Sequence, residues 1–222
     1  MFKTALFQHK YVPALRPGPE EKVLVMLHGL GDSLNGFTWM PGELRLENLS
    51  YLLVNAPDDY YGGFSWFDFS GGGQYMEDAV PGILRSRKLL FELLRELVVH
   101  GIKPGNIILA GFSQGCLMAL DVGLRTDLVL GGICGISGWL AFEEEYPAAF
   151  SPTASSQKIL ATHGIRDPLL PYTKVETQYA HLKSLGIDLS FKGYDKDHTL
   201  LPVELADIRA WLVERTAGLY PR

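Results

Sequence analysis

The sequence predicts an α/β protein with a mostly parallel central sheet flanked by helices. Short apolar runs of strand length, rich in β-branched and aromatic residues, alternate with longer segments whose apolar residues recur at helical spacing. All but the last run show little polar alternation, as expected of strands covered on both faces. Alternating strands and helices are typical of a parallel sheet wrapped by helices. The predicted strands are 23–27, 51–55, 106–110, 132–136, 158–162 and 189–194.

The predicted helices follow from the same periodicity. Residues 81–100 form the longest one, because four leucines from Leu90 to Leu97 share a face and Gly101 follows. The other predicted helices are 114–125, 173–185 and 202–216. Three prolines within residues 1–20 predict an edge strand or hairpin before the main sheet.

Length and composition narrow the class of protein. A chain of 222 residues, 47% hydrophobic, predicts a single domain over residues 1–222. A net charge of -5 without long runs of either sign disfavours nucleic acid binding. No apolar run reaches the roughly 18 residues of a membrane-spanning helix, and residues 1–10 contain no secretory apolar segment, so we expect a cytoplasmic protein. Its two cysteines are predicted to be inert buried thiols.

Polar residues follow the predicted strands at the points where each strand ends. These segments are His28–Asp32, Gly111–Gly115, Ser137–Gly138, His163–Asp167 and Asp195–His198. The carboxyl ends of parallel strands lie at one edge of a sheet, where ligands of such folds bind. The chemistry is therefore expected at this edge.

Residues 111–115 read Gly-Phe-Ser-Gln-Gly and match the Gly-x-Ser-x-Gly pattern of a nucleophile elbow. A predicted strand precedes Ser113 and a predicted helix follows it, which is the context that this turn requires. A glycine-flanked serine also occurs in ordinary turns, so the pattern alone is weak. In this context we interpret Ser113 as a nucleophile.

A serine needs a base and an orienting acid, which in the α/β-hydrolase arrangement follow it in the order acid, then histidine. Asp167 and His198 stand in that order after successive strands. The competing interpretations are a turn aspartate before Pro168 and an exposed loop histidine. A metal site pooling His28, His163, His198 and Asp167 lacks clustered ligand spacing, so no metal or other cofactor is expected.

Stabilising an oxyanion requires two backbone N–H donors. We expect these from Gln114 and from Leu30, which lies in the glycine-rich segment 28–32. The alternative for this segment is a dinucleotide-binding turn, but its third glycine is missing.

Taken together, the motifs resemble the carboxylesterase and acyl-protein thioesterase family of small α/β-hydrolases. The resemblance covers nearly the whole chain and rests on the segments 27–32, 55–57, 65–68, 111–115, 136–140 and 163–171, and on His198. It implies an α/β-hydrolase fold, and the short segment between Leu140 and Gln157, where an insertion could lie, predicts that there is no cap domain. It also implies hydrolysis of small-molecule carboxylic esters or thioesters without cofactor or metal, with Ser113, Asp167 and His198 as the triad and Leu30 and Gln114 as oxyanion donors.

Two segments depart from the family pattern. Residues 58–65 form a shorter loop than usual, which favours short and medium acyl chains over long ones. Phe64 and Trp66, with Leu169 and Leu170, are the predicted substrate contacts, and the glycines at 71–73 are a candidate mobile loop. Asp195 and Asp197 crowd His198 with carboxylates where the family has glycine-rich sequence, which is expected to raise the imidazole pKa.

The functional hypothesis is a serine esterase that works through an acyl-enzyme. The alternatives are an acyl-protein thioesterase or lysophospholipase acting on long acyl chains and, in a different class, a non-catalytic ligand-binding protein on the same fold. No integral membrane segment is expected, and a homodimer is kept as one option for the oligomeric state.

Overall fold

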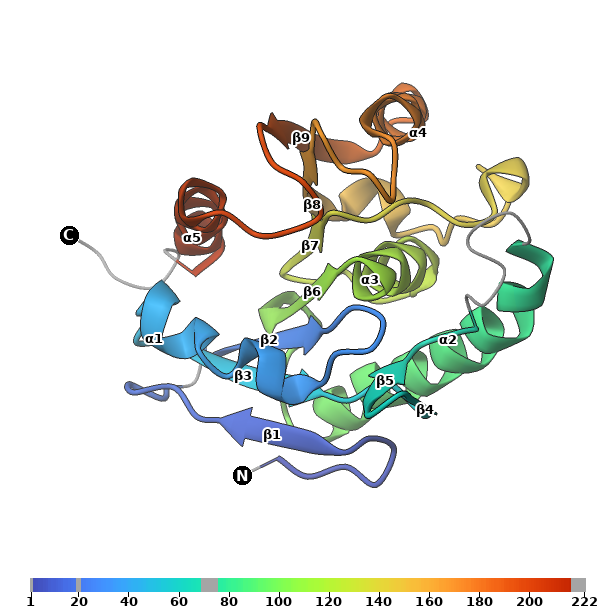
Figure 1. Cartoon of the computed structure of the whole chain (residues 1–222). Coiled ribbons are helices and arrows are strands. Elements are labelled where there is room, and N and C mark those ends of the chain that lie inside the picture. Colours follow the sequence, from blue (N-terminus) through green and yellow to red (C-terminus); the bar gives the residue numbers. More distant parts are fainter. Residues whose placement is uncertain (1, 19–20, 69–75, 217–222) are drawn as a thin grey trace.

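A seven-stranded sheet forms the centre of the protein in a computed structural model that describes residues 2–18, 21–68 and 76–216 (Figure 1). Six strands run parallel, and β1 pairs antiparallel with β3 at one edge. In spatial order the strands are β1 (His9–Val12), β3 (Leu49–Val54), β2 (Lys22–Leu27), β6 (Ile107–Phe112), β7 (Gly132–Ile136), β8 (Lys158–Gly164) and β9 (Asp188–Tyr194).

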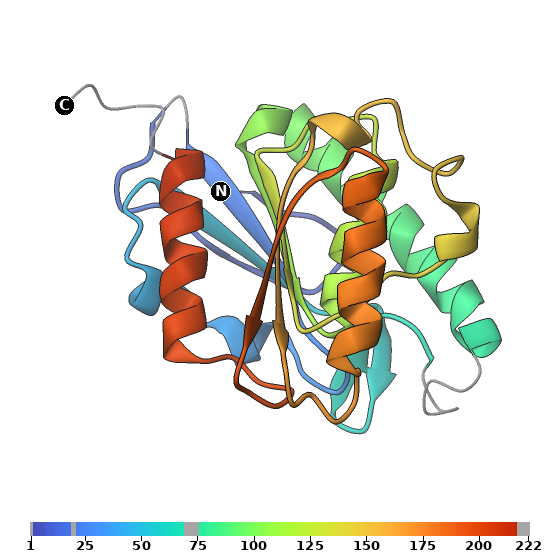
Figure 2. The ribbon, with the colours of Figure 1, turned by 90° about the horizontal axis from the view of Figure 1, so that it is seen from above.

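Helices cover both faces of this sheet (Figure 2). On one face lie α1 (Met40–Leu44) and α5 (Pro202–Thr216), and on the other lie α2 (Met76–Val99), α3 (Gln114–Arg125) and α4 (Tyr172–Ser184). Each face has its own apolar core, one packed against α2, α3 and α4 and the other against α1 and α5. The predicted α/β architecture is therefore confirmed, and the sheet is buried from both sides.

The predicted strands and three of the four predicted helices match the observed elements to within about two residues. The exception is α2, which begins at Met76 with Pro81 inside it, whereas the sequence pattern placed its start at about Pro81. A proline usually marks a helix start because it lacks the N–H donor that interior positions need. The small antiparallel hairpin of β4 (Asp58–Tyr60) and β5 (Gly63–Ser65) was not predicted.

The connections at the carboxyl ends of the parallel strands determine how open this edge of the sheet is. Between β7 and β8 the chain forms two short 3₁₀ turns, Glu143–Glu145 and Ala154–Ser156. In the described ranges no cap domain covers this edge, in agreement with the sequence prediction. Within the same ranges, no helix is both long and apolar enough to span a bilayer.

A buried carboxylate joins α2 to α3. Asp121 is 1% exposed and accepts hydrogen bonds from Arg87 Nε at 2.6 Å and from Arg125 Nε at 2.9 Å. Both guanidinium groups are partly exposed, so this cluster is less costly to disrupt than a fully buried ion pair.

We expect Asp121→Asn to lower the free energy of unfolding by about 2–3 kcal/mol, because two arginines lose their shared charge partner. Urea denaturation measures this loss. Asp188→Asn is the matched control, since Asp188 forms an exposed ion pair with Lys158 and should cost less than about 1 kcal/mol. Equal losses in the two variants would contradict a structural role for the buried cluster.

Candidate active site

Ser113 lies at a sharp turn between β6 and α3. Its backbone adopts φ 54° and ψ −116°, outside the regions that L-residues normally occupy. Glycine is required on both sides, because a Cβ at Gly111 would lie 2.1 Å from the Gly115 carbonyl oxygen and a Cβ at Gly115 would lie 2.2 Å from that of Leu27. The close approach presses α3 onto the sheet and lifts the Ser113 side chain above its edge.

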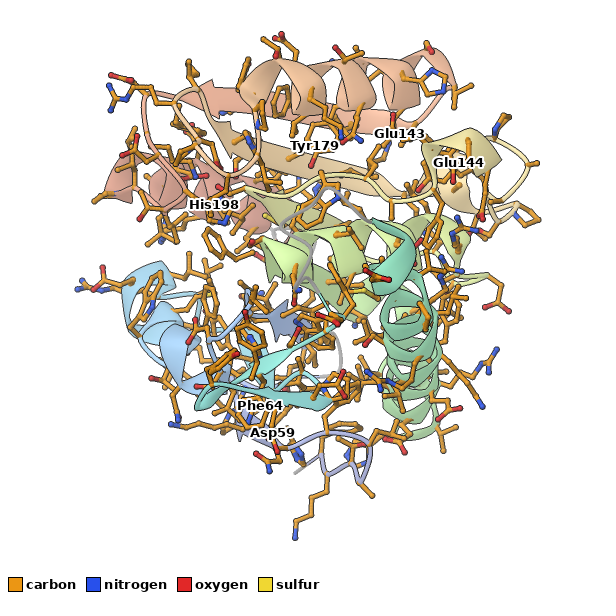
Figure 3. All side chains as sticks on the ribbon, turned by 45° about the vertical axis from the view of Figure 1, so that its right-hand side comes forward. Asp59, Phe64, Glu143, Glu144, Tyr179 and His198 are labelled. Atoms are coloured by element: carbon orange, nitrogen blue, oxygen red, sulfur yellow. The ribbon has the colours of Figure 1, made fainter. Side chains whose placement is uncertain are left out.

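His198 and Asp167 complete a hydrogen-bonded chain with this serine. Ser113 Oγ lies 2.9 Å from His198 Nε2, and His198 Nδ1 lies 2.7 Å from Asp167 Oδ2. His198, labelled in Figure 3, comes from the loop between β9 and α5. Asp167 follows β8. Because the carboxylate accepts from Nδ1–H, Nε2 is left free to accept the Ser113 proton.

Asp167 is held in its ionised form. Burial alone would raise its pKa, but hydrogen bonds from His198 and from two backbone N–H groups hold the pKa below its ordinary value. The backbone donors are Leu169 and Leu170, at 2.9 and 3.0 Å from Asp167 Oδ1. An ionised carboxylate here can stabilise a positive charge on His198.

The two predicted oxyanion donors, Leu30 and Gln114, border the same cavity as Ser113. Gln114 is the first residue of α3, so its N–H has no acceptor within the helix. The loop that carries Leu30 is fixed by the hairpin, because Gly31 N–H donates to Phe64 O and Phe64 N–H donates to Asp32 O, both at 2.9 Å. The β4–β5 hairpin thus holds this loop through backbone hydrogen bonds.

The buried side chain of His28 also holds this loop. Its Nδ1 lies 2.6 Å from Gly29 O, and its Nε2 accepts from Ala56 N–H at 2.9 Å. Burial lowers the pKa of His28, which favours the neutral ring that both hydrogen bonds need. The sequence interpretation of His28 as a residue that shapes the loop agrees with these contacts.

A mainly apolar cavity of about 350 Å³ opens in front of Ser113. Leu169 and Leu170, both predicted substrate contacts, border it. Leu169 is 68% exposed at the rim. The full set of described lining residues is Gly29, Leu30, Asp32, Phe112, Ser113, Gln114, Trp139, Leu169, Leu170 and His198.

Trp66 and Phe64, the other two predicted contacts, are not among the described residues of this lining. Trp66 is fully buried, packs against Phe7 and donates from Nε1 to His28 O at 2.9 Å. Phe64 lies on the hairpin, well apart from His198 (Figure 3). Trp66 and Phe64 therefore hydrogen-bond to the segment 28–32 that carries Leu30, and neither lines the described cavity. Gly71–Gly73, the candidate mobile loop, falls outside the described residues.

The side chain of Gln114 has a role that sequence reasoning missed. Its Oε1 accepts from Trp66 N–H at 3.0 Å, and its Nε2 donates to Phe67 O at 2.9 Å. The amide thus ties the beginning of α3 to the segment after the hairpin. Its position next to Ser113 in the motif was the available signal, but the motif assigns a role only to the backbone N–H.

The acidic residues beside His198 are differently placed from the expectation. Asp195 and Asp197 are exposed, and Arg166 lies 2.6 Å from the first and 3.6 Å from the second. The positive charge of Arg166 and the surrounding solvent therefore weaken the electrostatic effect of both carboxylates on His198. Lys196, between them, points the other way and is 2% exposed.

The metal interpretation gains no support from the described ranges, where no group of three or more histidine, cysteine or acidic side chains could hold an ion. His163 Nε2 lies 2.9 Å from Leu170 O and so holds the loop after Asp167. His28 is similarly engaged with backbone.

The fold and the Ser–His–Asp arrangement define a serine hydrolase with the α/β-hydrolase fold. A sequence model of the phospholipase/carboxylesterase family matches residues 14–215, and the chain belongs to this family. The chain is 30% identical to acyl-protein thioesterase 1 of Gibberella zeae, over 85% of this chain and 88% of that protein. It is also 30% identical to a probable carboxylesterase of Oryza sativa subsp. japonica, over 85% of this chain and 76% of that protein.

Among solved structures, Zea mays acyl-protein thioesterase 2 superposes with a TM-score of 0.79 at 25% identity. The superposition covers 94% of this chain and 99% of that one. The resemblance inferred from the motifs is thus confirmed. The protein is an esterase- or thioesterase-type serine hydrolase.

Proposed function

We propose that the protein hydrolyses carboxylic esters of short to medium acyl chains through an acyl-enzyme on Ser113. The observation that carries this proposal is the hydrogen-bonded chain from Ser113 through His198 to Asp167 beside an apolar cavity. A ligand-binding protein would have no need of a serine held in a strained turn against a histidine.

In the first half of the reaction, Ser113 Oγ attacks the carbonyl carbon while its proton passes to His198 Nε2. Asp167 stabilises the imidazolium that results. The tetrahedral intermediate places its oxyanion toward the N–H groups of Leu30 and Gln114, and the beginning of α3 adds a favourable dipole. His198 then donates its proton to the leaving alcohol or thiol, and the C–O or C–S bond breaks.

In the second half, water attacks the acyl-enzyme. His198 takes a proton from the water, the C–O bond to Ser113 breaks, and the serine regains its proton. The carboxylic acid product leaves as its anion. Each step uses only groups of this chain and water, so the mechanism requires no cofactor.

The size of the cavity supports the preference for shorter chains. Its volume of about 350 Å³ lies near the low end of ligand pockets, which span about 300–1,000 Å³. Trp139, Leu169 and Leu170 supply its apolar wall. A longer chain would leave methylenes in water beyond the rim.

We expect kcat/KM for p-nitrophenyl esters to rise roughly fourfold per added methylene while the chain stays inside the cavity, and then to level or fall. The cause is the roughly 0.8 kcal/mol gained per buried methylene. The measurement uses a homologous series kept below micelle concentrations. Leu169→Ser should flatten this rise, whereas Val129→Ser, at an exposed position preceding β7 at the opposite end of the sheet, should not. Activity that climbs steadily through palmitoyl would contradict the short-chain proposal.

The second candidate is an acyl-protein thioesterase acting on long chains. The names of the relatives favour it, and so does the exposed apolar side chain of Leu169, which borders the cavity and is 68% exposed. Matched ester and thioester substrates of equal chain length distinguish the two candidates through their kcat/KM ratio.

We further propose that residues 1–222 act as one hydrolase domain in the cytoplasm. A single large sheet and a family match over residues 14–215 support one domain. Two buried free cysteines suit a reducing compartment. The net charge of -5 argues against nucleic acid as a partner.

A further inference from the structure

We propose that Lys196, through a buried ion pair with Glu204, is a positioning residue that holds His198 in place for the reaction. The inference rests on the function proposed above, since it assigns His198 the role of base. Lys196 Nζ lies 2.7 Å from Glu204, and both side chains are fully buried.

The ammonium group closes a turn around the histidine. Lys196 Nζ donates to the backbone carbonyl of Thr199 at 2.6 Å, and residues 196 and 199 flank His198 in the chain. Thr199 N–H in turn donates to Asp197 O at 2.9 Å. The backbone on both sides of His198 is therefore fixed from within the protein.

The same ammonium joins the histidine loop to the serine side of the site. It donates to Ser137 Oγ at 2.9 Å, and Ser137 follows β7, the strand next to β6 in the sheet. The ends of β6 and β7 are hydrogen-bonded to each other at this point, since Ser113 N–H donates to Ile136 O at 2.9 Å. Lys196 thus fixes the relative position of the two loops that bring base and nucleophile together.

Glu204 anchors this arrangement to α5. Its second carboxylate oxygen accepts from Leu201 N–H at 3.2 Å, which stabilises the first turn of the helix after the histidine loop. Burial lowers the pKa of Lys196, while the hydrogen bond and charge of Glu204 oppose this shift. The carboxylate therefore favours the charged form of the lysine, which can donate to all three acceptors.

Stability alone does not explain the pair. Replacing a buried ion pair with apolar residues of similar volume is often neutral or stabilising, because desolvation of two charges offsets their attraction. An apolar pair could fill the space, but it could not hold the Thr199 carbonyl or the Ser137 hydroxyl. Neither Lys196 nor Glu204 borders the described cavity, so the predicted effect is on turnover and not on substrate binding.

The test is the double variant Lys196→Met with Glu204→Met, which removes both charges at nearly constant volume. We expect a folded protein whose kcat falls on the order of tenfold to a hundredfold while KM stays within about twofold, because a small displacement of His198 weakens proton transfer. The rate of fluorophosphonate labelling of Ser113 should fall in parallel. Wild-type kcat and labelling in the folded double variant would overturn the inference.

The matched control is Lys192→Met with Asp207→Asn. This ion pair also joins β9 to α5, but it is exposed, and the further hydrogen bond that Asp207 accepts from the Tyr194 hydroxyl at 2.6 Å can be kept by the amide oxygen of asparagine. Removal of this exposed pair should leave kcat unchanged. A fall in kcat equal to that of the buried pair would show that the loss of any ion pair between β9 and α5 slows turnover, which would contradict the proposal.

Two further variants keep the result interpretable. If Lys196→Met with Glu204→Met does not fold, Ser137→Ala removes one of the three acceptors and should lower kcat severalfold at constant KM, whereas unchanged kcat would overturn the inference. Ser113→Ala is measured beside them. Full activity in that variant would refute the proposed nucleophile, while an inactive Ser113→Ala together with a fully active double variant refutes only the positioning role.

Discussion

Ser113→Ala is expected to lower kcat on the order of 10⁶-fold while leaving the protein folded. The hydroxyl is the only group on this side chain that can form the acyl-enzyme, and no described cavity residue offers a second hydroxyl or thiol. Within the described residues its hydroxyl hydrogen-bonds to His198, so the free energy of unfolding should change by about 1 kcal/mol or less. The measurements are ester turnover and fluorophosphonate labelling of purified protein.

Ser184→Ala is the matched control for this substitution. Ser184 lies exposed at the end of α4, where its hydroxyl donates to His181 O. The control should keep full turnover and labelling. If Ser113→Ala also kept them, the nucleophile would have to be another residue.

Asp167→Asn is expected to lower kcat on the order of 10⁴-fold. An amide in place of the carboxylate can donate to Nδ1, which favours the tautomer with the proton on Nε2. In that tautomer His198 cannot accept the Ser113 proton. The positive charge that develops on the imidazole also loses its partner. Turnover of a short-chain ester measures this loss.

Asp197→Asn serves as the comparison, because it removes the carboxylate nearest to His198 in sequence. Asp197 is exposed and pairs with Arg166 at 3.6 Å, so its loss should change kcat by less than about twofold. A larger loss for Asp197→Asn than for Asp167→Asn would mean that the acid of the triad is misassigned.

The central sheet and the candidate catalytic residues could be predicted from the sequence because both depend on local patterns. Apolar runs such as 107–110 are buried on both faces, and the glycines at 111 and 115 are needed for a close backbone approach. The order of Asp167 and His198 along the chain follows from the order of parallel strands. These features leave a signal within a few residues of each position.

The features that were missed depend on contacts between distant segments. Lys196 stands in the sequence Asp-Lys-Asp-His, which reads as an exposed charged loop, and its burial requires Glu204 and Ser137 from other elements. Trp66 has the composition of a pocket aromatic, but its packing against Phe7 and His28 is long-range. The strands of the β4–β5 hairpin are three residues each, too short to show alternation.

The backbone of Ser113 has a consequence for the evolution of the protein. A side chain in this sparsely populated conformation costs about 1–3 kcal/mol, a cost that glycine at the same position would not bear. Ser113→Gly, which removes the nucleophile, can therefore increase the resistance of the protein to heat. Selection for catalysis and selection for thermal resistance oppose each other at residue 113, and the tight packing of Gly111 and Gly115 against neighbouring backbone is what keeps the active conformation populated.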